Sequence, residues 1–389
     1  MYSILTINSI AEKGLENFRK DDIPYSADAK DYDAIILRSK DIHEMEQPES
    51  LLAVARAGAG YNNIPVDKMS EKGIVVFNTP GANANAVKEL TIGGLILASR
   101  KIAEGIIWAK DLKGDVASQV EDGKKAFVGP ELIGKTLGVI GLGAIGAMVA
   151  NTAIELGMDV LGYDPFIDID AAWHLSAAIG HETDLKALVA KSDYISIHVP
   201  VNDSTTGMIN ADFLAGAKDG VRIVNFARGE LVNEDDLIAA LECGKVVAYV
   251  SDFPSEKLLA AKNTTMVPHL GASTPESEEN CAIMAAKQLV AYLKYGNIVN
   301  SVNFPNTVMP YTGKTRIAIV NSNVPSMISK ITTTFADEGI NIDNMVNRSR
   351  GDLAYTLIDV DSFGDNGEDL LKALRAVDGI VRVRLVQKS

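Results

Sequence analysis

The sequence predicts an α/β protein built on a doubly wound parallel sheet, followed by a small domain of βαββαβ order. Short apolar runs alternate with helical patterns over roughly the first 300 residues. One of these runs enters a glycine-rich turn that opens a helix. The tail from Thr315 to Ser389 reads strand, helix, strand, strand, helix, strand, which is the ferredoxin-like order.

The first 250 residues provide the strands and helices of the sheet region. A small α/β region occupies residues 1–80, where helical patterns and Gly or Pro turns separate the strand patterns. A long helical pattern then runs from residue 87 to residue 110. We expect strands at 3–8, 34–38, 51–55, 74–78, 137–140, 160–163, 194–198, 222–225 and 246–250.

The segment from Thr136 to Gly146 reads as a strand, a glycine turn and the start of a helix. In the pattern Gly141-x-Gly143-x-x-Gly146, the glycines serve a tight turn, close backbone approach to a pyrophosphate, and helix–strand packing. The next strand ends on Asp164, an acid at the distance that suits the hydroxyl groups of an adenosine ribose. A glycine pattern alone could be only a turn, but this combination predicts a dinucleotide site.

The acids around Asp164 indicate which dinucleotide binds. Asp168 and Asp170 follow it, with no Lys or Arg between them. A 2′-phosphate would be repelled there, so NAD is favoured over NADP.

The composition excludes several classes of protein. The chain has 389 residues, is 47% hydrophobic and carries a net charge of −14, without the basic clusters that nucleic-acid binding requires. No apolar run of about 18 residues predicts a membrane span, and the first residues read as a strand rather than a signal peptide. The two cysteines, Cys243 and Cys281, lack metal-ligand spacing, so we expect no metal site and a cytoplasmic location.

Three side chains near predicted strand ends could carry chemistry. Arg228 stands in Asn225-Phe-Ala-Arg228-Gly229, Glu256 follows the strand at 246–250, and His269 stands in Pro268-His269-Leu-Gly. Open α/β sheets bind ligands at the carboxyl ends of their strands. Together the three fit oxidation of a hydroxy acid: Arg228 holds the carboxylate, His269 takes the hydroxyl proton, and Glu256 stabilises the imidazolium.

Each candidate also has a plainer interpretation. Arg228 could form a surface ion pair, Glu256 could be a solvated loop charge, and a lone histidine is more often structural than catalytic. His198 ends another predicted strand and is a rival base, although we favour a hydrogen-bonded histidine lining the cofactor cleft.

The tail follows a segment rich in Pro, Asn and Gly at residues 300–314. The helix before this segment is expected to begin after Thr274, a plausible N-cap, and to end at Gly296. The tail is short and poor in catalytic groups, which favours a regulatory or oligomerisation domain.

The ordered motifs resemble those of the D-isomer-specific 2-hydroxyacid dehydrogenases over essentially the whole chain. The match consists of the glycine pattern, Asp164, His198-Val199-Pro200, Asn225-x-Ala-Arg228-Gly229 and Pro268-His269-x-Gly-Ala-Ser. The resemblance implies a Rossmann-type NAD domain at 86–281, inserted in a flavodoxin-like substrate domain made of 1–85 and 282–312. An ACT-like regulatory domain would occupy 313–389. It also implies an active site in the cleft between the first two domains and a homodimer or homotetramer.

The loops at 56–62 and 77–83, with the tail, resemble those of family members that act on D-3-phosphoglycerate. The resemblance therefore implies NAD-dependent oxidation to 3-phosphohydroxypyruvate, the first committed step of L-serine biosynthesis. The alternative substrate is another D-2-hydroxy acid, such as lactate, glycerate or hydroxyisocaproate. Two alternatives belong to other functional classes: a non-enzymatic scaffold that senses NAD, and an amino-acid sensor.

The same resemblance assigns roles to individual residues. Catalysis falls to Arg228, Glu256 and His269. Cofactor binding falls to Gly141, Gly143, Ala144, Ile145, Gly146, Asp164, His198, Val199, Pro200, Thr205, Ala227, Asp252 and Gly271. Substrate binding falls to Arg38, Lys40, Gly58, Ala59, Gly60 and Asn83. The N–H groups of the loop from 58 to 60 would bind the carboxylate. Arg38, with Lys40 and Asn83, would bind the phosphate, although Lys40 could equally be a solvated charge. A serine effector would bind near Asn323 and Asn341.

Two stretches depart from the family pattern. The family has Asp-Val-Phe where this chain has Ser251-Asp252-Phe253, which leaves open whether Ser251 or Asp252 binds the carboxamide of the cofactor. In the tail, Asn321 and Ser326 differ from the pattern of serine-regulated members, so inhibition by serine is a hypothesis.

Overall fold

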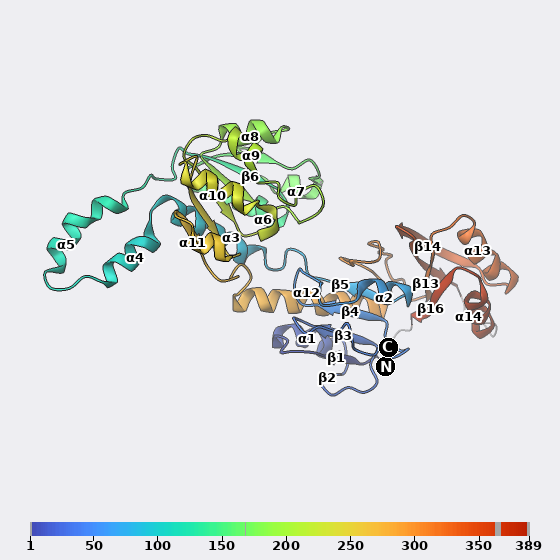
Figure 1. Cartoon of the computed structure of the whole chain (residues 1–389). Helices are drawn as coiled ribbons and strands as arrows, with labels where there is room; N and C mark the ends of the chain where they lie inside the picture. Colours follow the sequence, from blue (N-terminus) through green and yellow to red (C-terminus); the bar gives the residue numbers. More distant parts are fainter. Residues whose placement is uncertain (1, 168, 362–366, 387–389) are drawn as a thin grey trace. The chain divides into compact units, whose positions relative to one another are not determined.

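A computed structural model of the chain describes residues 2–167, 169–361 and 367–386. The chain forms two compact units, each of which is drawn in Figure 1. The first contains Met1–Asn83 and Pro275–Ser389, and the second contains Ala84–Thr274. The long helix that begins at Pro275 therefore belongs wholly to the first unit.

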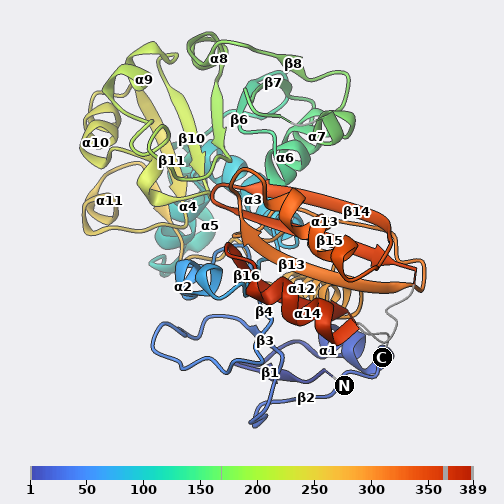
Figure 2. The same ribbon diagram turned by 90° about the vertical axis from the view of Figure 1, so that its right-hand side faces the viewer.

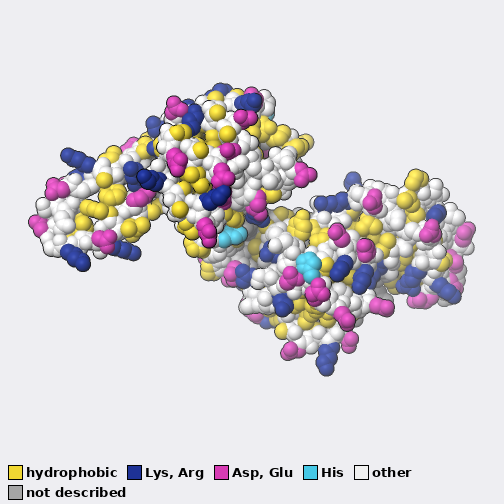
Figure 3. All heavy atoms as spheres, in the orientation of Figure 1, with side chains coloured by type: hydrophobic (Ala, Val, Ile, Leu, Met, Phe, Trp, Pro, Cys, Tyr) yellow, Lys and Arg dark blue, Asp and Glu magenta, His cyan; other side chains and the backbone are white. Residues whose placement is uncertain are grey.

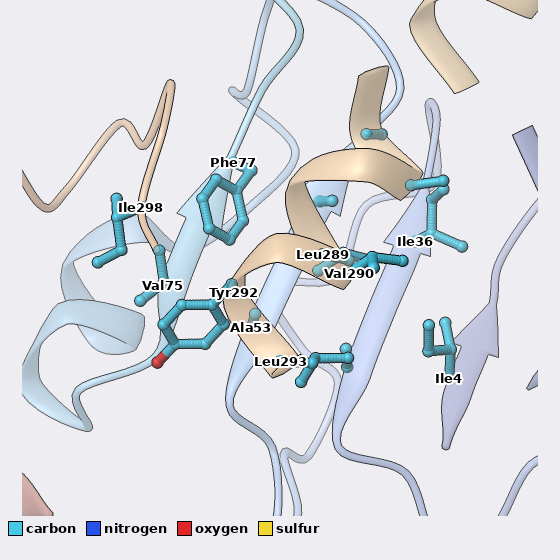
Figure 4. Close-up of a cluster of buried hydrophobic side chains, with 14 of the residues drawn as sticks. Ile4, Ile36, Ala53, Val75, Phe77, Leu289, Val290, Tyr292, Leu293 and Ile298 are labelled. Carbon is cyan, nitrogen blue, oxygen red and sulfur yellow. The ribbon is translucent and has the colours of Figure 1, made fainter. Parts of the chain in front are cut away.

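The first unit contains a five-stranded parallel sheet of order β2-β1-β3-β4-β5, which is the flavodoxin-like order. Helix α12 packs against this sheet through Leu289, Tyr292 and Leu293, which lie among Ile36, Ala53 and Phe77 (Figure 4). The elements are β1 (Ile4–Thr6), α1 (Glu12–Lys20), β2 (Tyr25–Ser26), β3 (Ala34–Leu37), β4 (Ala53–Arg56), α2 (Val66–Glu71), β5 (Val75–Phe77) and α12 (Pro275–Tyr295).

The C-terminal part of this unit is an antiparallel sheet of order β14-β15-β13-β16 with two helices, as the βαββαβ pattern predicts. Helices α13 and α14 pack on one of its faces (Figure 2). This is an ACT-like arrangement. Its elements are β13 (Thr315–Ser322), α13 (Met327–Asp337), β14 (Ile342–Arg350), β15 (Leu353–Val360), α14 (Gly367–Ala376) and β16 (Ile380–Val386).

The second unit contains a seven-stranded parallel sheet of order β12-β11-β10-β9-β6-β7-β8. Counted along the chain, six of these strands have the Rossmann order 3-2-1-4-5-6, and β12 adds a seventh. Its strands are β6 (Thr136–Ile140), β7 (Asp159–Tyr163), β8 (Gly180–His181), β9 (Tyr194–Ile197), β10 (Val221–Asn225), β11 (Val246–Ser251) and β12 (Thr264–Met266). Its helices are α3 (Ala84–Ser99), α4 (Ile102–Lys110), α5 (Val116–Gly123), η1 (Lys124–Phe127), α6 (Ala144–Glu155), α7 (Ile169–Trp173), α8 (Leu185–Lys191), α9 (Ala211–Gly216), η2 (Gly229–Leu231), α10 (Glu234–Glu242) and α11 (Glu256–Ala260).

The single helix that the sequence predicts from 87 to 110 is wrong, because the structure contains two helices there. Lys101 has φ +30°, and a left-handed residue cannot continue a right-handed helix. Before this break, α3 packs in the core of the unit through Leu95 and Ala98. After it, α4 has no buried residue and leads with α5 into an arm that extends from the sheet (Figure 1).

None of the described helices combines the length and the apolar composition that a membrane crossing requires.

Candidate functional site

The glycine turn after β6 is closely packed at two glycines and open at the third. A Cβ on Gly141, whose φ is +90°, would lie 2.7 Å from the carbonyl oxygen of His198. A Cβ on Gly146 would lie 1.9 Å from the carbonyl oxygen of Gly141. Gly143 directly precedes α6, which begins with Ala144 and Ile145. Apart from its chain neighbours, no atom of the described residues lies within 4 Å of its Cβ position. That space at a helix N-terminus fits a pyrophosphate.

Asp164 follows β7 and holds the glycine turn from beside it. Its Oδ2 accepts a hydrogen bond of 2.8 Å from the Leu142 N–H, and its Oδ1 accepts one of 2.9 Å from the Phe166 N–H. A carboxylate has further lone pairs, which suit ribose hydroxyl donors. Asp168 and the side chain of Asp170, which the sequence also puts here, lie outside the described residues.

Asp252, the first residue after β11, is fully buried and only half satisfied. Its Oδ2 accepts a hydrogen bond of 2.9 Å from the Gly271 N–H, while its buried Oδ1 has no hydrogen-bond partner among the described residues. A buried carboxylate oxygen without a donor is costly, and the amide of a nicotinamide carboxamide would supply one. The neighbouring Ser251 hydroxyl accepts the Phe253 N–H at 3.2 Å in a local turn. The residues of this unit therefore fit NAD, with Asp252 rather than Ser251 as the better acceptor.

His198, the rival base, directly follows β9 and is half-buried, with its Nδ1 atom fully enclosed. Its Nε2 lies 2.8 Å from the Ser196 hydroxyl, and its Nδ1 has no partner among the described residues. Burial lowers the pKa of His198 from 6.5 to about 4. The ring is therefore neutral and weakly basic at neutral pH, which favours the lining role over the catalytic one.

The other cofactor candidates are fixed by local bonds. The Thr205 hydroxyl donates to the Pro200 carbonyl at 2.7 Å. The Ala227 N–H donates to Oδ1 of Asn225 at 3.1 Å, and Val199 packs beside the Gly141 Cβ position. These contacts shape the loops after β9 and β10.

The three catalytic candidates follow neighbouring strands of one sheet edge. Arg228 comes after β10, Glu256 opens α11 after β11, and His269 comes after β12. Phe253 links two of these positions. Its Cβ lies 3.2 Å from the Cβ position of Gly229, and its ring centroid lies 4.9 Å from that of His269. The sequence reasoning missed this role of Phe253, because only the folded sheet brings the two loops together.

The reactive groups of these side chains are open to a ligand. Arg228 donates through Nη1 to the Ala227 carbonyl at 2.7 Å, and Asn225 holds the Arg228 carbonyl at 2.8 Å. In the described chain, neither the Glu256 carboxylate nor the His269 ring forms a hydrogen bond, with each other or with another group. Both side chains are exposed.

The substrate candidates Arg38, Lys40, Gly58, Ala59, Gly60 and Asn83 all belong to the first unit. Arg56, which sequence reasoning left without a role, ties two of these positions together. Its Nε donates to the Arg38 carbonyl at 3.1 Å and its Nη1 donates to the Gly60 carbonyl at 2.7 Å. The loop wraps around its guanidinium, since a Cβ on Gly58 would lie 2.6 Å from Arg56 Nη1.

Two features of this loop change the expected roles. The Gly58 N–H already donates to the Arg56 carbonyl at 2.9 Å, so it is not available to a carboxylate in this structure. The Ala59 carbonyl is held by the side chain of Asn78 at 2.6 Å.

The two cations proposed for the phosphate differ in their partners. Arg38 is paired with Glu278 at 2.8 Å, whereas the exposed Lys40 has no ion-pair partner in the described residues.

The effector candidates lie in the C-terminal domain and bond to nearby loops. The Asn323 side chain donates to the Gly351 carbonyl at 3.0 Å. The Asn341 side chain donates to Oδ2 of Asp361 at 3.1 Å. Both residues are exposed at the ends of strands.

Comparison with known proteins identifies the family of this fold. Residues 92–271 match the model of the D-isomer-specific 2-hydroxyacid dehydrogenase NAD-binding domain. The chain is 35% identical to a D-3-phosphoglycerate dehydrogenase of Methanocaldococcus jannaschii, over 80% of this chain and 59% of that protein. It is 31% identical to the Escherichia coli K12 D-3-phosphoglycerate dehydrogenase, over 98% of this chain and 97% of that protein.

A solved structure gives the same result. The NAD⁺-bound 3-phosphoglycerate dehydrogenase of Entamoeba histolytica superposes with a TM-score of 0.61 and 28% identity, covering 78% of this chain and 98% of that one. The chain thus spans about three fifths of the archaeal relative and nearly all of the bacterial one. It belongs to the D-isomer-specific 2-hydroxyacid dehydrogenase family.

Proposed function

We propose that this protein is an NAD-dependent dehydrogenase that oxidises D-3-phosphoglycerate to 3-phosphohydroxypyruvate, which commits carbon to L-serine. The observation that carries the choice of substrate is the bonding of Arg56 to both the Arg38 backbone and the Gly60 carbonyl. This bonding holds Arg38, the proposed phosphate-binding cation, beside the loop from 58 to 60, where the Ala59 and Gly60 N–H groups would bind the carboxylate. The names of the bacterial and archaeal relatives support the same substrate.

In this proposal the residues of the second unit position the reacting atoms. Arg228 binds the α-carboxylate and the oxygen on C2, and His269 removes the proton of the C2 hydroxyl. Glu256 hydrogen-bonds to His269 once substrate is bound, which stabilises the imidazolium; such bonds often form only in the complex. Bound NAD supplies the hydride acceptor.

The cofactor would be held by residues along the carboxyl edge of the seven-stranded sheet. Gly143 and the start of α6 receive the pyrophosphate, and Asp164 receives the adenosine ribose. The unpartnered Oδ1 of Asp252 accepts the carboxamide N–H and fixes the nicotinamide face. Neutral His198 lines the cleft.

The test is NADH consumption by the purified protein with 3-phosphohydroxypyruvate, beside pyruvate, hydroxypyruvate and 2-oxoglutarate. The proposal expects a strong preference for the phosphorylated acid. A preference for an unphosphorylated acid would retain the mechanism and overturn the substrate. If the protein binds NADH but turns over none of these acids, the result would support the alternative of a non-enzymatic NAD-sensing scaffold.

We further propose that the enzyme works as a homo-oligomer. The arm formed by α4 and α5 exposes apolar side chains, including Ile106 at 52%, Ile107 at 67% and Val116 at 45% (Figure 3). Exposed apolar patches of this kind mark protein interfaces. Light scattering would measure the molar mass of the protein in solution. If the arm forms a dimer interface, Ile107→Glu should shift the dimer toward the monomer.

Two further assignments complete the proposal. The free thiols Cys243 and Cys281 fit a cytoplasmic enzyme. Serine is the proposed effector, bound near Asn323 and Asn341. If the addition of serine leaves the reaction rate unchanged, serine is not an effector of this protein.

A further inference from the structure

The carboxyl end of α12 is closed by side chains of the C-terminal domain. The last carbonyl groups of a helix have no partners within the helix. Arg384 donates to the Tyr292 carbonyl at 2.7 Å and to the Leu293 carbonyl at 3.0 Å. The Tyr355 hydroxyl donates to the Gly296 carbonyl at 2.7 Å. Three carbonyls at this end of α12 thus accept hydrogen bonds from a different part of the sequence, and that of Tyr292 also accepts the Gly296 N–H at 2.9 Å.

The charges at this contact are buried. Arg316 is fully buried and forms two hydrogen bonds, of 2.6 and 2.8 Å, with the carboxylate of Asp359. Its other N–H groups donate to the carbonyls of Tyr295, Met309 and Pro310 at 2.8–2.9 Å. One buried ion pair of the C-terminal domain therefore holds both the end of α12 and the segment that leads away from it.

Arg384 is 9% exposed, and no carboxylate of the described residues pairs with it. Its guanidinium carbon lies 4.4 Å from the centroid of the Tyr292 ring. The carboxyl end of a helix carries a partial negative charge, so α12 itself is the counter-charge. An isolated C-terminal domain would expose this arginine without a partner, and an isolated substrate domain would expose the carbonyls.

The apolar core continues across the same contact. One face of the antiparallel sheet packs on α13 and α14. The opposite face contributes Ala318, Val320, Tyr355, Leu357 and Val386 to the cluster that contains Tyr292, Leu293, Ile298, Phe304 and Met309. The approach is close at Gly296, where a Cβ would lie 2.8 Å from Leu357.

We propose that the C-terminal domain is a permanent part of the substrate domain, docked on the carboxyl end of α12, and not a module on a flexible tether. The segment from 300 to 314 is fixed on both sides: Val302 bonds to Val76 at 2.9 Å, and Arg316 holds Met309 and Pro310. A ligand bound to the C-terminal domain acts on the substrate domain through α12. This regulatory consequence rests on the proposed effector site, whereas the docking does not.

Hydrogen exchange of the full-length protein tests the docking. Arg384→Met removes two bonds to α12 and keeps an apolar stem, and Tyr355→Phe removes one. Exchange of the amides of residues 293–297 should accelerate about tenfold in the first variant and a few-fold in the second. Arg375→Met, an exposed arginine on the outer helix α14, is the matched control and should leave the rates unchanged.

A second measurement covers the case in which Arg384→Met does not fold. Native-state exchange of the unmodified protein at rising denaturant reports which elements open together. If the C-terminal domain is docked as proposed, β13, β15 and α12 should lose their protection from hydrogen exchange in one step. Opening of the C-terminal sheet at low denaturant, with α12 still protected, would overturn the proposal, as would wild-type exchange rates in both variants. Neither result depends on the substrate, so activity assays test the proposed function separately.

Discussion

Nη2 of Arg38 lies 2.8 Å from Oε1 of Glu278, so the cation proposed for the substrate phosphate is already paired with an acid at the start of α12. The two side chains are 38% and 45% exposed. An ion pair at this exposure contributes between about 0 and 1 kcal/mol. A phosphate dianion would therefore compete with Glu278 for the guanidinium at little cost.

Replacing Glu278 by Gln should improve binding of the phosphorylated substrate. The substitution removes a negative charge beside the phosphate position, so we expect the KM for 3-phosphoglycerate to fall a few-fold, with kcat little changed. The KM for unphosphorylated D-glycerate should not move. Glu279→Gln, which breaks the neighbouring pair with Lys13, is the control. A rise in KM would show instead that Glu278 orients Arg38.

Asp252→Asn should weaken cofactor binding. The change puts an amide N–H where the structure has either the acceptor for Gly271 or the unpartnered Oδ1. Loss of a charge-assisted hydrogen bond costs about 1.5–3 kcal/mol, which is a roughly tenfold to hundredfold rise in the Kd for NADH. Fluorescence titration measures it. Asp219→Asn, at an exposed pair with Lys245, should bind NADH as the parent does.

Alanine substitutions at Gly143 and Gly146 should have different effects, one on cofactor binding and the other on the stability of the fold. Alanine at Gly146 meets the Gly141 carbonyl at 1.9 Å, so the backbone must shift and the melting temperature should fall by several degrees. A methyl group at Gly143 would have no contact within 4 Å in the described structure, so the stability should be kept. This methyl group would occupy the pyrophosphate position, and NADH binding should weaken strongly. Equal stability of the two variants would contradict the packing of the turn.

The alternation of strands and helices and the spacing of the glycines were sufficient to predict the Rossmann order and the βαββαβ tail, because both depend on local periodicity. The choice between Ser251 and Asp252 could not be made from the sequence. It depends on where β11 ends and on the Gly271 N–H, which arrives from the loop after β12. The break at Lys101 was hidden because α4 stays apolar although none of its residues is buried in the described part of the chain.

The docking of the C-terminal domain on α12 could not be predicted from the sequence either. Arg316 and Arg384 read as ordinary strand arginines, and their partners are main-chain carbonyls, which leave no pattern of complementary side chains in the sequence. Arg56 was hidden for the same reason, since it bonds to the carbonyls of Arg38 and Gly60.

The half-buried ring of His198 should make the stability of the ligand-free protein depend on pH. Its pKa is lowered from 6.5 to about 4 by burial, so between these values the unfolded chain binds a proton that the folded chain does not. The stabilisation is complete above pH 6.5 and is lost progressively as the pH falls toward 4. A shift of this size corresponds to a few kcal/mol.

Urea unfolding of the protein and of His198→Gln, at several pH values from 7.5 to about 4.5, measures this effect. The free energy of unfolding should fall less steeply with acid in the variant, because glutamine does not titrate. His181→Gln, which changes an exposed histidine, should retain the slope of the parent. Parallel curves for the parent and His198→Gln would mean that folding does not lower the pKa of His198. The imidazole would then be a stronger base than the structure indicates, and its role as rival base would have to be reconsidered.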